Sequence, residues 1–302
     1  MTGKVYIGVS GWRYPPWRGH FYPKGLAQAR ELQHASRQFN SIEINGSFYS
    51  LQRPSSYAQW AEDTPPGFVF SVKGGRYITH MLRLRHAESA LANFLASGLF
   101  ALGHKLGPIL WQFPPQMRFH PEVFEPFLRA LPHDTEAAAR IARARDAERM
   151  AGREMVASPV RLPLRHAVEV RHESFADPTF IALLRRHRVA WVVSDSPDWP
   201  QYQDLTADFV YMRLHGSREL YNSRYSAQEL DQWAARIEAW RHGRQPAQSR
   251  LISPQPPQRL SGRDVFCYFD NTDKLQAPVN ARELMALLGL RWPAQAFANP
   301  PS

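Results

Sequence analysis

Short apolar runs recur eight times along the chain, and most of them end in a charged or amide side chain. The runs cover residues 5–10, 41–46, 68–73, 108–113, 166–171, 190–195, 209–215 and 264–270. Buried parallel strands are continuously apolar, and strands that alternate with helices indicate a parallel sheet. Eight such units predict an α/β fold, a single (β/α)8 TIM-type barrel with helical and loop insertions.

Helix signals lie between most of these runs. Three helix starts carry capping patterns, namely Asp177 before Pro178, Ser226 with Glu229, and Asn280 with Glu283. Gly289 is predicted to end the last of these helices, and a further long helix is predicted over 88–102. The helical signal is weaker at 55–62, which is short, and at 198–206, which is compatible with a loop.

Two segments interrupt the alternation of strands and helices. Residues 135–155 are rich in Ala, Arg and Glu, which predicts a polar helix that projects into solvent or covers a neighbour only weakly. Residues 242–262 contain four prolines among polar residues, which predicts a mobile loop. We expect one barrel domain over 1–292 and a frayed tail over 293–302.

Composition places the chain among ordinary globular proteins. It has 302 residues, of which 44% are hydrophobic and 21% are charged. No apolar stretch approaches the roughly 20 residues that span a bilayer, so we expect no membrane segment. The first run begins too early for a signal peptide, and Cys267 is the only cysteine, within an apolar run. Together these features favour a cytoplasmic protein without disulfides.

Positive charge is in excess, with 37 basic and 27 acidic residues and a net charge of +10. Such an excess attracts phosphates and nucleic acids. The arginines are scattered through 140–165 and 218–263 rather than gathered in one block. A solvated basic surface is therefore favoured over a nucleic-acid footprint.

Polar side chains cluster where the predicted strands end. They are Glu43, Asn45, Lys73, Gln112, Glu169, Arg171, Asp195, Arg213, His215, Asp270 and Asn271. Residues two apart on a strand share a face, and barrel chemistry lies at the carboxyl ends of the strands. We expect these groups to converge on one polar site. The alternative is a structural ion-pair network that fills the top of the barrel.

Loops that follow the strands add aromatic candidates. The segment 10–23 contains five aromatic residues, of which Trp12 is the best placed to stack on a ligand, whereas Trp17 and Phe21 are expected to pack. After the seventh run, Tyr221 and Tyr225 are predicted to line the same site. The Gly-Gly pair that follows Lys73 lets backbone amides approach an anion, but it also marks any tight turn.

Several short motifs, in order along the chain, resemble the YecE-like family, domain of unknown function 72. They include Gly8-Val9-Ser10-Gly11-Trp12, Glu43-Ile44-Asn45, Ile78-Thr79-His80, Gln112-Phe113-Pro114-Pro115, Glu169-Val170-Arg171-His172, Arg213-Leu214-His215-Gly216 and Phe269-Asp270-Asn271. Asp270 stands where the family has Asn, and Ser47 where Thr is usual. The resemblance covers about residues 4–290, implies a TIM-type barrel and implies no established reaction. It also marks 135–155 and 242–262 as variable insertions.

An enzyme with a small anionic, phosphate-bearing substrate is the favoured hypothesis. Lys73, Arg171 and Arg213 would bind the anion, because fixed cations stabilise developing negative charge. His215 would orient or protonate the substrate, and Glu43 or Glu169 would be the base. We expect no cofactor and no metal ion, and the sequence makes no prediction of oligomeric state.

Three other functions compete with this hypothesis. A metal-dependent hydrolase or isomerase would use Glu43, Glu169, Asp195, His215 and Asp270 as ligands, but three nearby cations would repel a divalent ion. A non-catalytic module for nucleic acid or nucleotide would use the basic surface and the aromatic loop. A glycosidase pair of Glu43 and Glu169 is disfavoured, because neighbouring arginines lower the pKa that the acid needs.

Overall fold

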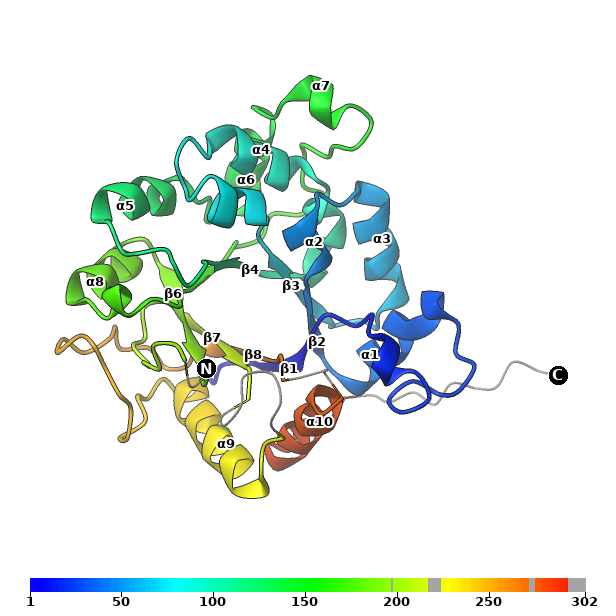
Figure 1. Cartoon of the computed structure of the whole chain (residues 1–302). Coiled ribbons are helices and arrows are strands. Elements are labelled where there is room, and N and C mark those ends of the chain that lie inside the picture. The colour runs from blue at the N-terminus through cyan, green and yellow to red at the C-terminus, as the bar shows by residue number, and fades with distance from the viewer. Residues whose placement is uncertain (197, 217–223, 272–274, 293–302) are drawn as a thin grey trace.

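Eight parallel strands close into a barrel in sequence order, and β8 pairs with β1 (Figure 1). The structure is a computed structural model and describes residues 1–196, 198–216, 224–271 and 275–292. The strands are β1 (Val5–Ser10), β2 (Ser41–Ile44), β3 (Val69–Lys73), β4 (Leu106–Gln112), β5 (His166–Glu169), β6 (Val189–Ser194), β7 (Phe209–Leu214) and β8 (Asp264–Phe269). Each predicted apolar run overlaps one strand, so the predicted TIM-type barrel is confirmed.

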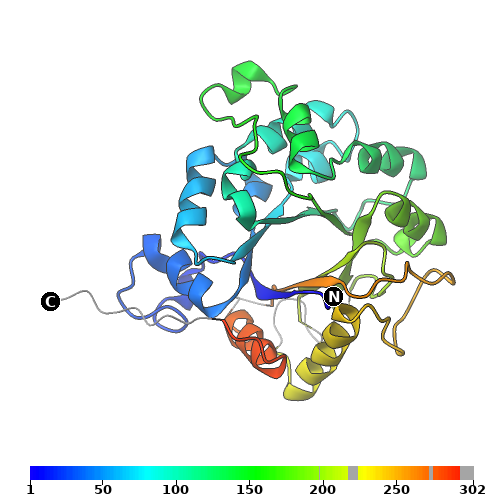
Figure 2. The ribbon, with the colours of Figure 1, turned by 180° about the vertical axis from the view of Figure 1, so that it is seen from behind.

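Helices surround the strands in both views of the ribbon (Figures 1 and 2). They are α1 (Glu31–Gln38), α2 (Gly46–Tyr49), α3 (Pro54–Asp63), α4 (Glu88–Ala96), α5 (Pro121–Ala130), α6 (Thr135–Ala142), α7 (Ala147–Met150), α8 (Pro178–Arg186), α9 (Ala227–Arg241) and α10 (Ala277–Leu287). Apolar side chains between strands and helices form the larger core of the molecule. This outer core holds the strand ends, and hence the site, in fixed positions.

The barrel interior has a second apolar cluster of its own. Its buried members are Leu110, Ala167, Ala190, Val192, Phe209, Tyr211, Phe266 and Tyr268. The Tyr268 hydroxyl lies 2.7 Å from Ser41 Oγ, and the Tyr211 hydroxyl lies 2.6 Å from Ser71 Oγ, so the phenol groups are satisfied inside the barrel. Arg213 follows Tyr211 by two residues and faces the same way. The interior cluster therefore forms the floor of the polar site.

Two of the three predicted helix starts are confirmed. The side chain of Asp177 accepts from the Thr179 amide at the start of α8, and Ser226 and Glu229 form the capping box of α9. The third is wrong, because α10 begins at Ala277, with Pro278 in its first turn, and Asn280 lies inside the helix. Proline favours the first turn, and the Asn280 amide is used in tertiary contacts instead.

Helix α4 is shorter than predicted, because the expected helix over 88–102 ends at Ala96. Gly98 has a left-handed φ of +106°, and a Cβ there would lie 2.4 Å from the Cα of Pro54. The chain therefore turns tightly against α3 and continues as a 3₁₀ helix over Leu99–Lys105. The weaker helical signal at 55–62 corresponds to α3, and the described part of 198–206 forms no helix.

The expectation for 135–155 is wrong for its first half, which is packed, whereas residues 146–149 and 151–153 are exposed as expected. The segment forms α6 and α7, and α6 packs on α4. Ala138, Ala139 and Ala142 are buried there. Small side chains let the two helices approach closely. Alanines add little to the hydrophobic pattern of a helix, so the sequence did not indicate this packing.

The segment 242–262 contains no helix or strand after the end of α9, as a loop requires. The carboxylate of Asp204 accepts from the amides of Ile252 and Ser253 at 2.8 and 3.0 Å, which ties this loop to the chain that precedes β7. Its predicted mobility stays a prediction. The predicted tail over 293–302 lies outside the described residues.

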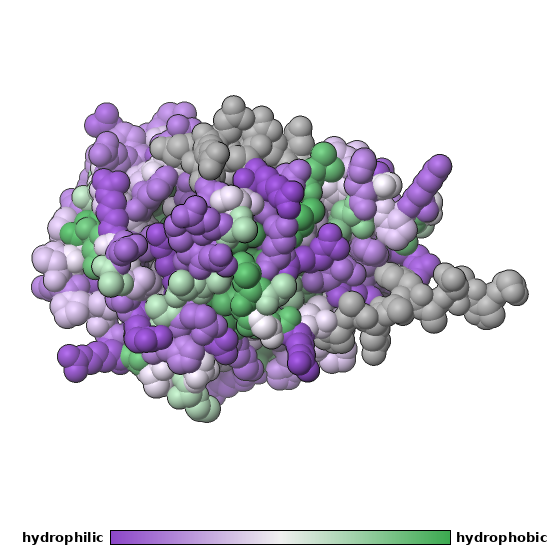
Figure 3. All heavy atoms as spheres, turned by 90° about the horizontal axis from the view of Figure 1, so that it is seen from below, coloured by the Kyte–Doolittle hydropathy of each residue, from purple (hydrophilic) through white to green (hydrophobic). Residues whose placement is uncertain are grey.

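The face seen from below is mainly hydrophilic, with apolar residues in a band across its middle and in smaller groups toward its edges (Figure 3). Over the described ranges, none of the helices has both the length and the apolar character to cross a bilayer. Cys267 is buried in β8, as expected for a small apolar side chain.

We predict that His166, at the start of β5, makes stability depend on pH. The side chain is fully buried, the Trp111 indole donates to Nδ1 at 3.2 Å, and Nε2 lies 2.6 Å from the Pro132 carbonyl oxygen. Burial lowers the pKa of His166 to about 4 from its ordinary 6.5. Between about pH 6.5 and pH 4, His166 is protonated in the unfolded chain but neutral in the folded chain. The free energy of unfolding therefore falls as pH falls through this range.

Urea unfolding at pH 7 and pH 4 measures this effect in the wild type and in His166→Gln. The pKa shift of His166 corresponds to a loss of roughly 3 kcal/mol in the free energy of unfolding of the wild type between pH 7 and pH 4. The loss between the two pH values should be smaller in the variant by about that amount. An equal loss in both proteins would contradict the assignment of a neutral, buried imidazole.

Candidate active site

The guanidinium of Arg213 is the centre of the polar cluster at the carboxyl end of the barrel. Its Nη1 donates to Glu169 Oε2 at 2.6 Å, and its Nη2 donates to Asp270 Oδ2 at 2.9 Å. Nε and Nη2 also donate to the two oxygens of Glu43 at 3.1 and 3.0 Å. Arg213 is fully buried, so carboxylates from β2, β5 and the end of β8 neutralise a charge that water cannot reach.

Glu43 is held on all sides and is inaccessible to a substrate. Ser10 donates to Oε1 at 2.5 Å and the Tyr211 hydroxyl donates to Oε2 at 2.7 Å, in addition to the bonds from Arg213. Asn45 joins this group, because its Nδ2 donates to Ser10 Oγ at 2.8 Å. Both oxygens of Glu43 are therefore committed, and the geometry favours a positioning role over the base role expected from sequence.

Glu169 bridges two arginines. Its Oε1 accepts from Nε and Nη2 of Arg171 at 3.1 and 2.9 Å, while Oε2 accepts from Arg213. Burial raises the pKa of Glu169, but the charges of Arg213 and Arg171 outweigh burial and hold this pKa well below its usual range. Glu169 is therefore a stable carboxylate and does not suit the proton-donating role of a glycosidase acid.

His215 lies between two carboxylates. Its Nδ1 is 3.4 Å from Asp270 Oδ2, and its Nε2 is 3.8 Å from Glu169 Oε1. Trp199 packs edge-on against the imidazole, with ring centroids 4.7 Å apart, and also carries the guanidinium of Arg171 at 3.7 Å from its ring centre. These contacts fix the plane of the ring.

Asp195 and Tyr225 support the backbone around His215. The Asp195 carboxylate accepts from the His215 amide at 2.8 Å and from the Tyr225 hydroxyl. That hydroxyl also accepts from the Gly216 amide at 2.8 Å. Burial raises the pKa of Asp195, and the bond from Tyr225 offsets part of this rise. Both side chains therefore shape the chain that leaves β7.

Lys73, at the end of β3, is the least committed cation of the cluster. Its side chain is 8% exposed, and its Nζ lies 4.4 Å from the centre of the Phe48 ring. Nζ makes no hydrogen bond or ion pair with any residue that the structure describes. Burial, together with the charge of Arg213, lowers the pKa of Lys73 to about 8, against the opposing effect of the nearby carboxylates.

Three predicted site residues make contacts away from the Arg213 network. Trp12 packs edge-on against Trp60 and borders a hollow of about 230 Å³ beside β2. Gln112 donates to the neighbouring Phe113 carbonyl at 3.2 Å, and Asn271 donates to Asn280 of α10 at 3.1 Å. The predicted ligand residue Tyr221 lies outside the described residues. As expected from sequence, Trp17 is buried in aromatic packing.

Sequence patterns missed four contributors to the site. Ser10 and Tyr211 both bond to Glu43, and the two-residue alternation that selected Arg213 also reaches Tyr211. Trp199 and Phe48 come from segments outside the strands, where periodicity carries no signal. Their roles depend on tertiary contacts alone.

The described carboxylates of the site bind an arginine and do not surround a position where a metal ion could be held. Across the described ranges, no group of three or more His, Cys, Asp or Glu side chains is arranged to hold a metal ion. Glu43, Glu169 and Asp270 all bind the guanidinium of Arg213. This donor set does not fit the metal-dependent alternative.

Comparison with known proteins gives a family match over nearly the whole chain. A model for the family described as protein of unknown function DUF72 matches residues 6–301. The UPF0759 protein YecE of Escherichia coli K12 is 30% identical over 110 residues, which are 36% of this chain and 38% of that protein. The UPF0759 protein YunF of Bacillus subtilis 168 is 31% identical over 116 residues, which are 37% of this chain and 40% of YunF. The matches thus span less than half of these relatives.

Solved structures of similar fold cover the chain more fully. A DUF72 family protein of Thermotoga maritima has a TM-score of 0.67 at 24% identity, over 95% of this chain and 99% of the other. A DUF72 family protein of Enterococcus faecalis has a TM-score of 0.64 at 16% identity, over 96% and 99%. At these identities the likeness shows a shared fold.

We predict that Arg213→Met destabilises the protein by about 3–5 kcal/mol, because it leaves three carboxylates without their buried counter-ion. Arg171→Met is the matched control, since Glu169 keeps its bond to Arg213 in that variant, and its loss should be smaller. Adding Glu43→Gln to Arg213→Met should recover part of the loss. Urea unfolding at pH 7 measures all of these variants, and equal losses in the two single variants would contradict a central role for Arg213.

Proposed function

The chain belongs to the DUF72 family of proteins of unknown function, and we propose that it is an enzyme that binds a small anionic substrate at the carboxyl end of its barrel. The family match agrees with the resemblance that the sequence motifs carry. The observation that supports the proposal is the ammonium of Lys73, which is nearly buried and has no acceptor among the described residues.

A buried cation without an acceptor costs several kcal/mol, and an anionic ligand would remove that cost. Lys73 lies at a strand end, where barrel enzymes place the groups that meet the substrate. A phosphate or carboxylate beside Nζ would supply the missing acceptor. Lys73 therefore selects a ligand of negative charge.

Arg171 is the second anion contact. It is 13% exposed on its side chain, and only its Nε and Nη2 are bound to Glu169, which leaves Nη1 available within the described part of the site. Arg213 takes a different role from the one expected, because its bonds to three carboxylates and its burial keep it from a ligand. The substrate anion is therefore bound by Lys73 and Arg171.

His215 carries the acid–base chemistry in this proposal. The imidazole lies within 4 Å of Asp270 and Glu169, so a proton taken from the substrate is stabilised by both carboxylates. Asp270 and Glu169 position the ring, as a carboxylate does in other histidine-dependent sites. An acid–base hydrolysis or isomerisation of a phosphate-bearing compound fits these groups without a metal ion or cofactor.

We predict that sulfate, an anion whose charge stays constant above pH 5, binds more weakly as pH rises through about 8. The pKa of Lys73 is about 8, so its ammonium is lost in a range where an ordinary lysine near 10.5 stays charged. Calorimetric titration from pH 6.5 to 9.5 measures the affinity. Lys73→Gln should lose at least tenfold at pH 7 and lose the pH dependence.

Lys24→Gln is the matched control, because it removes the same charge from an exposed position and should leave sulfate affinity within twofold of the wild type. A Lys73→Gln protein that binds sulfate like the Lys24→Gln protein would contradict the proposed anion site. Weak, salt-sensitive binding of nucleic acid that survives both substitutions would instead favour the non-catalytic alternative.

We predict that His215→Gln lowers kcat at least a hundredfold on the best substrate from a panel of phosphate monoesters, with little change in KM. General acid–base catalysis contributes this much in typical enzymes. Lys73→Gln should show the opposite pattern, a rise in KM that exceeds the fall in kcat. Equal turnover by wild type and His215→Gln would rule out the assigned proton transfer.

A further inference from the structure

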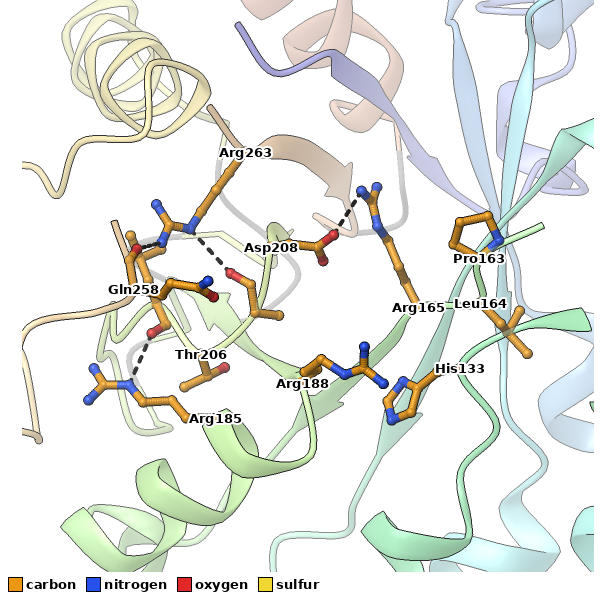
Figure 4. A pocket seen from close by; sticks show the side chains of 12 residues that line it. His133, Pro163, Leu164, Arg165, Arg185, Arg188, Thr206, Asp208, Gln258 and Arg263 are labelled. Carbon is orange, nitrogen blue, oxygen red and sulfur yellow. Dashed lines mark hydrogen bonds and ion pairs between the residues drawn. The ribbon is translucent and has the colours of Figure 1, made fainter. Parts of the chain in front are cut away.

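A cavity lies at the amino ends of β5 to β8, at the opposite end of the barrel from Lys73. It measures about 210 Å³ and is drawn in Figure 4. Arg165, Arg188, Asp208 and Arg263, four of the residues that line it, each come directly before one of these strands. Arg185 of α8 and His133 complete its charged lining. The barrel topology thus gathers four arginines in one small space.

Carboxylates neutralise only one of these arginines. Arg165 donates to Asp264 at 2.7 Å and to Asp208 at 3.2 Å, and Figure 4 draws the second of these pairs. Asp208, the only carboxylate that lines the described cavity, is therefore already engaged. The charges of Arg185, Arg188 and Arg263 have no carboxylate within ion-pair distance in the described ranges.

Arg263 is the most unusual of the three, because it is 1% exposed and its guanidinium meets only backbone carbonyl oxygens. It donates to Ala207 at 3.2 Å, to Gly243 at 3.3 Å and to Gln258. Neutral carbonyls satisfy the N–H groups but leave the buried positive charge without a counter-ion. Burial accordingly lowers the pKa of Arg263.

Arg185 and Arg188 add two more positive charges to the lining of the cavity. Arg185 donates to the Leu205 carbonyl at 3.3 Å and to Ser253 Oγ at 3.2 Å, which are again neutral acceptors. The side chain of Arg188 makes no hydrogen bond or ion pair with a described residue, and in Figure 4 it lies beside His133. Its backbone φ of +53° is uncommon for arginine.

We propose that this cavity is an anion site in its own right, which binds a phosphate group, free or as part of a small phosphate monoester. Guanidinium groups bind phosphate oxygens in pairs, with fixed geometry. The volume equals that of about seven water molecules, enough for a phosphate and a small substituent. Leu164, Leu205 and Ala207 offer an apolar wall for the substituent.

The site is tested in a Lys73→Gln background, which removes the anion contact proposed at the other end of the barrel. Inorganic phosphate and phenyl phosphate are the probes, and calorimetry at pH 7.5 measures their affinity. Arg188→Gln should weaken both probes at least tenfold. Arg188 is exposed and makes no bond that the fold needs, so this variant should keep the melting temperature of its parent.

Arg186→Gln is the matched control, because it removes the neighbouring arginine, whose side chain pairs with Glu125 outside the cavity. Its phosphate affinity should stay within twofold of the background protein. The proposal is overturned if the Lys73→Gln protein binds neither probe, or if Arg188→Gln and Arg186→Gln bind them equally. Neither result bears on the proposed active site, because both are measured in proteins that lack Lys73 and differ only at the amino end of the barrel.

Discussion

The whole polar site depends on the ion pairs between the guanidinium of Arg213 and three carboxylates inside a closed barrel. A buried charge is tolerated only when it is paired and fully hydrogen-bonded, so Glu43, Glu169 and Asp270 are fixed by the need to neutralise Arg213. Because those carboxylates come from three different strands, the network also fixes the strand ends relative to one another. The two groups assigned to chemistry, Lys73 and His215, are positioned on this frame.

The protein neutralises some of its buried positive charges with its own carboxylates and, within the described residues, leaves others without a counter-ion. At the carboxyl end, Arg213 is fully paired while Lys73 is not; at the amino end, Arg165 is paired while Arg263 meets only carbonyl oxygens. The net charge of +10 is thus not only a solvated surface, because part of it is buried at both ends of the barrel. Unpaired buried cations are the common physical basis of both proposed anion sites.

Sequence alone was enough for the barrel and for most of the central network. Continuous apolar runs identified every strand, and the two-residue alternation placed Glu43, Glu169 and Arg213 on inward faces. Sequence could not show which cation is neutralised, because that depends on distances between strands that are far apart in the chain. It also missed the turn at Gly98 and the packing of α6, where backbone approach rather than side-chain pattern decides the structure.

A crystal structure with selenate, located by its anomalous signal, tests the central assignment most directly. We expect selenate against Lys73 and Arg171, with Arg213 still bound by Glu43, Glu169 and Asp270. Selenate in contact with an Arg213 that has turned away from those carboxylates would contradict it. A structure with no selenate at the carboxyl end of the barrel, in which Lys73 Nζ donates to an acceptor of the protein, would also contradict it.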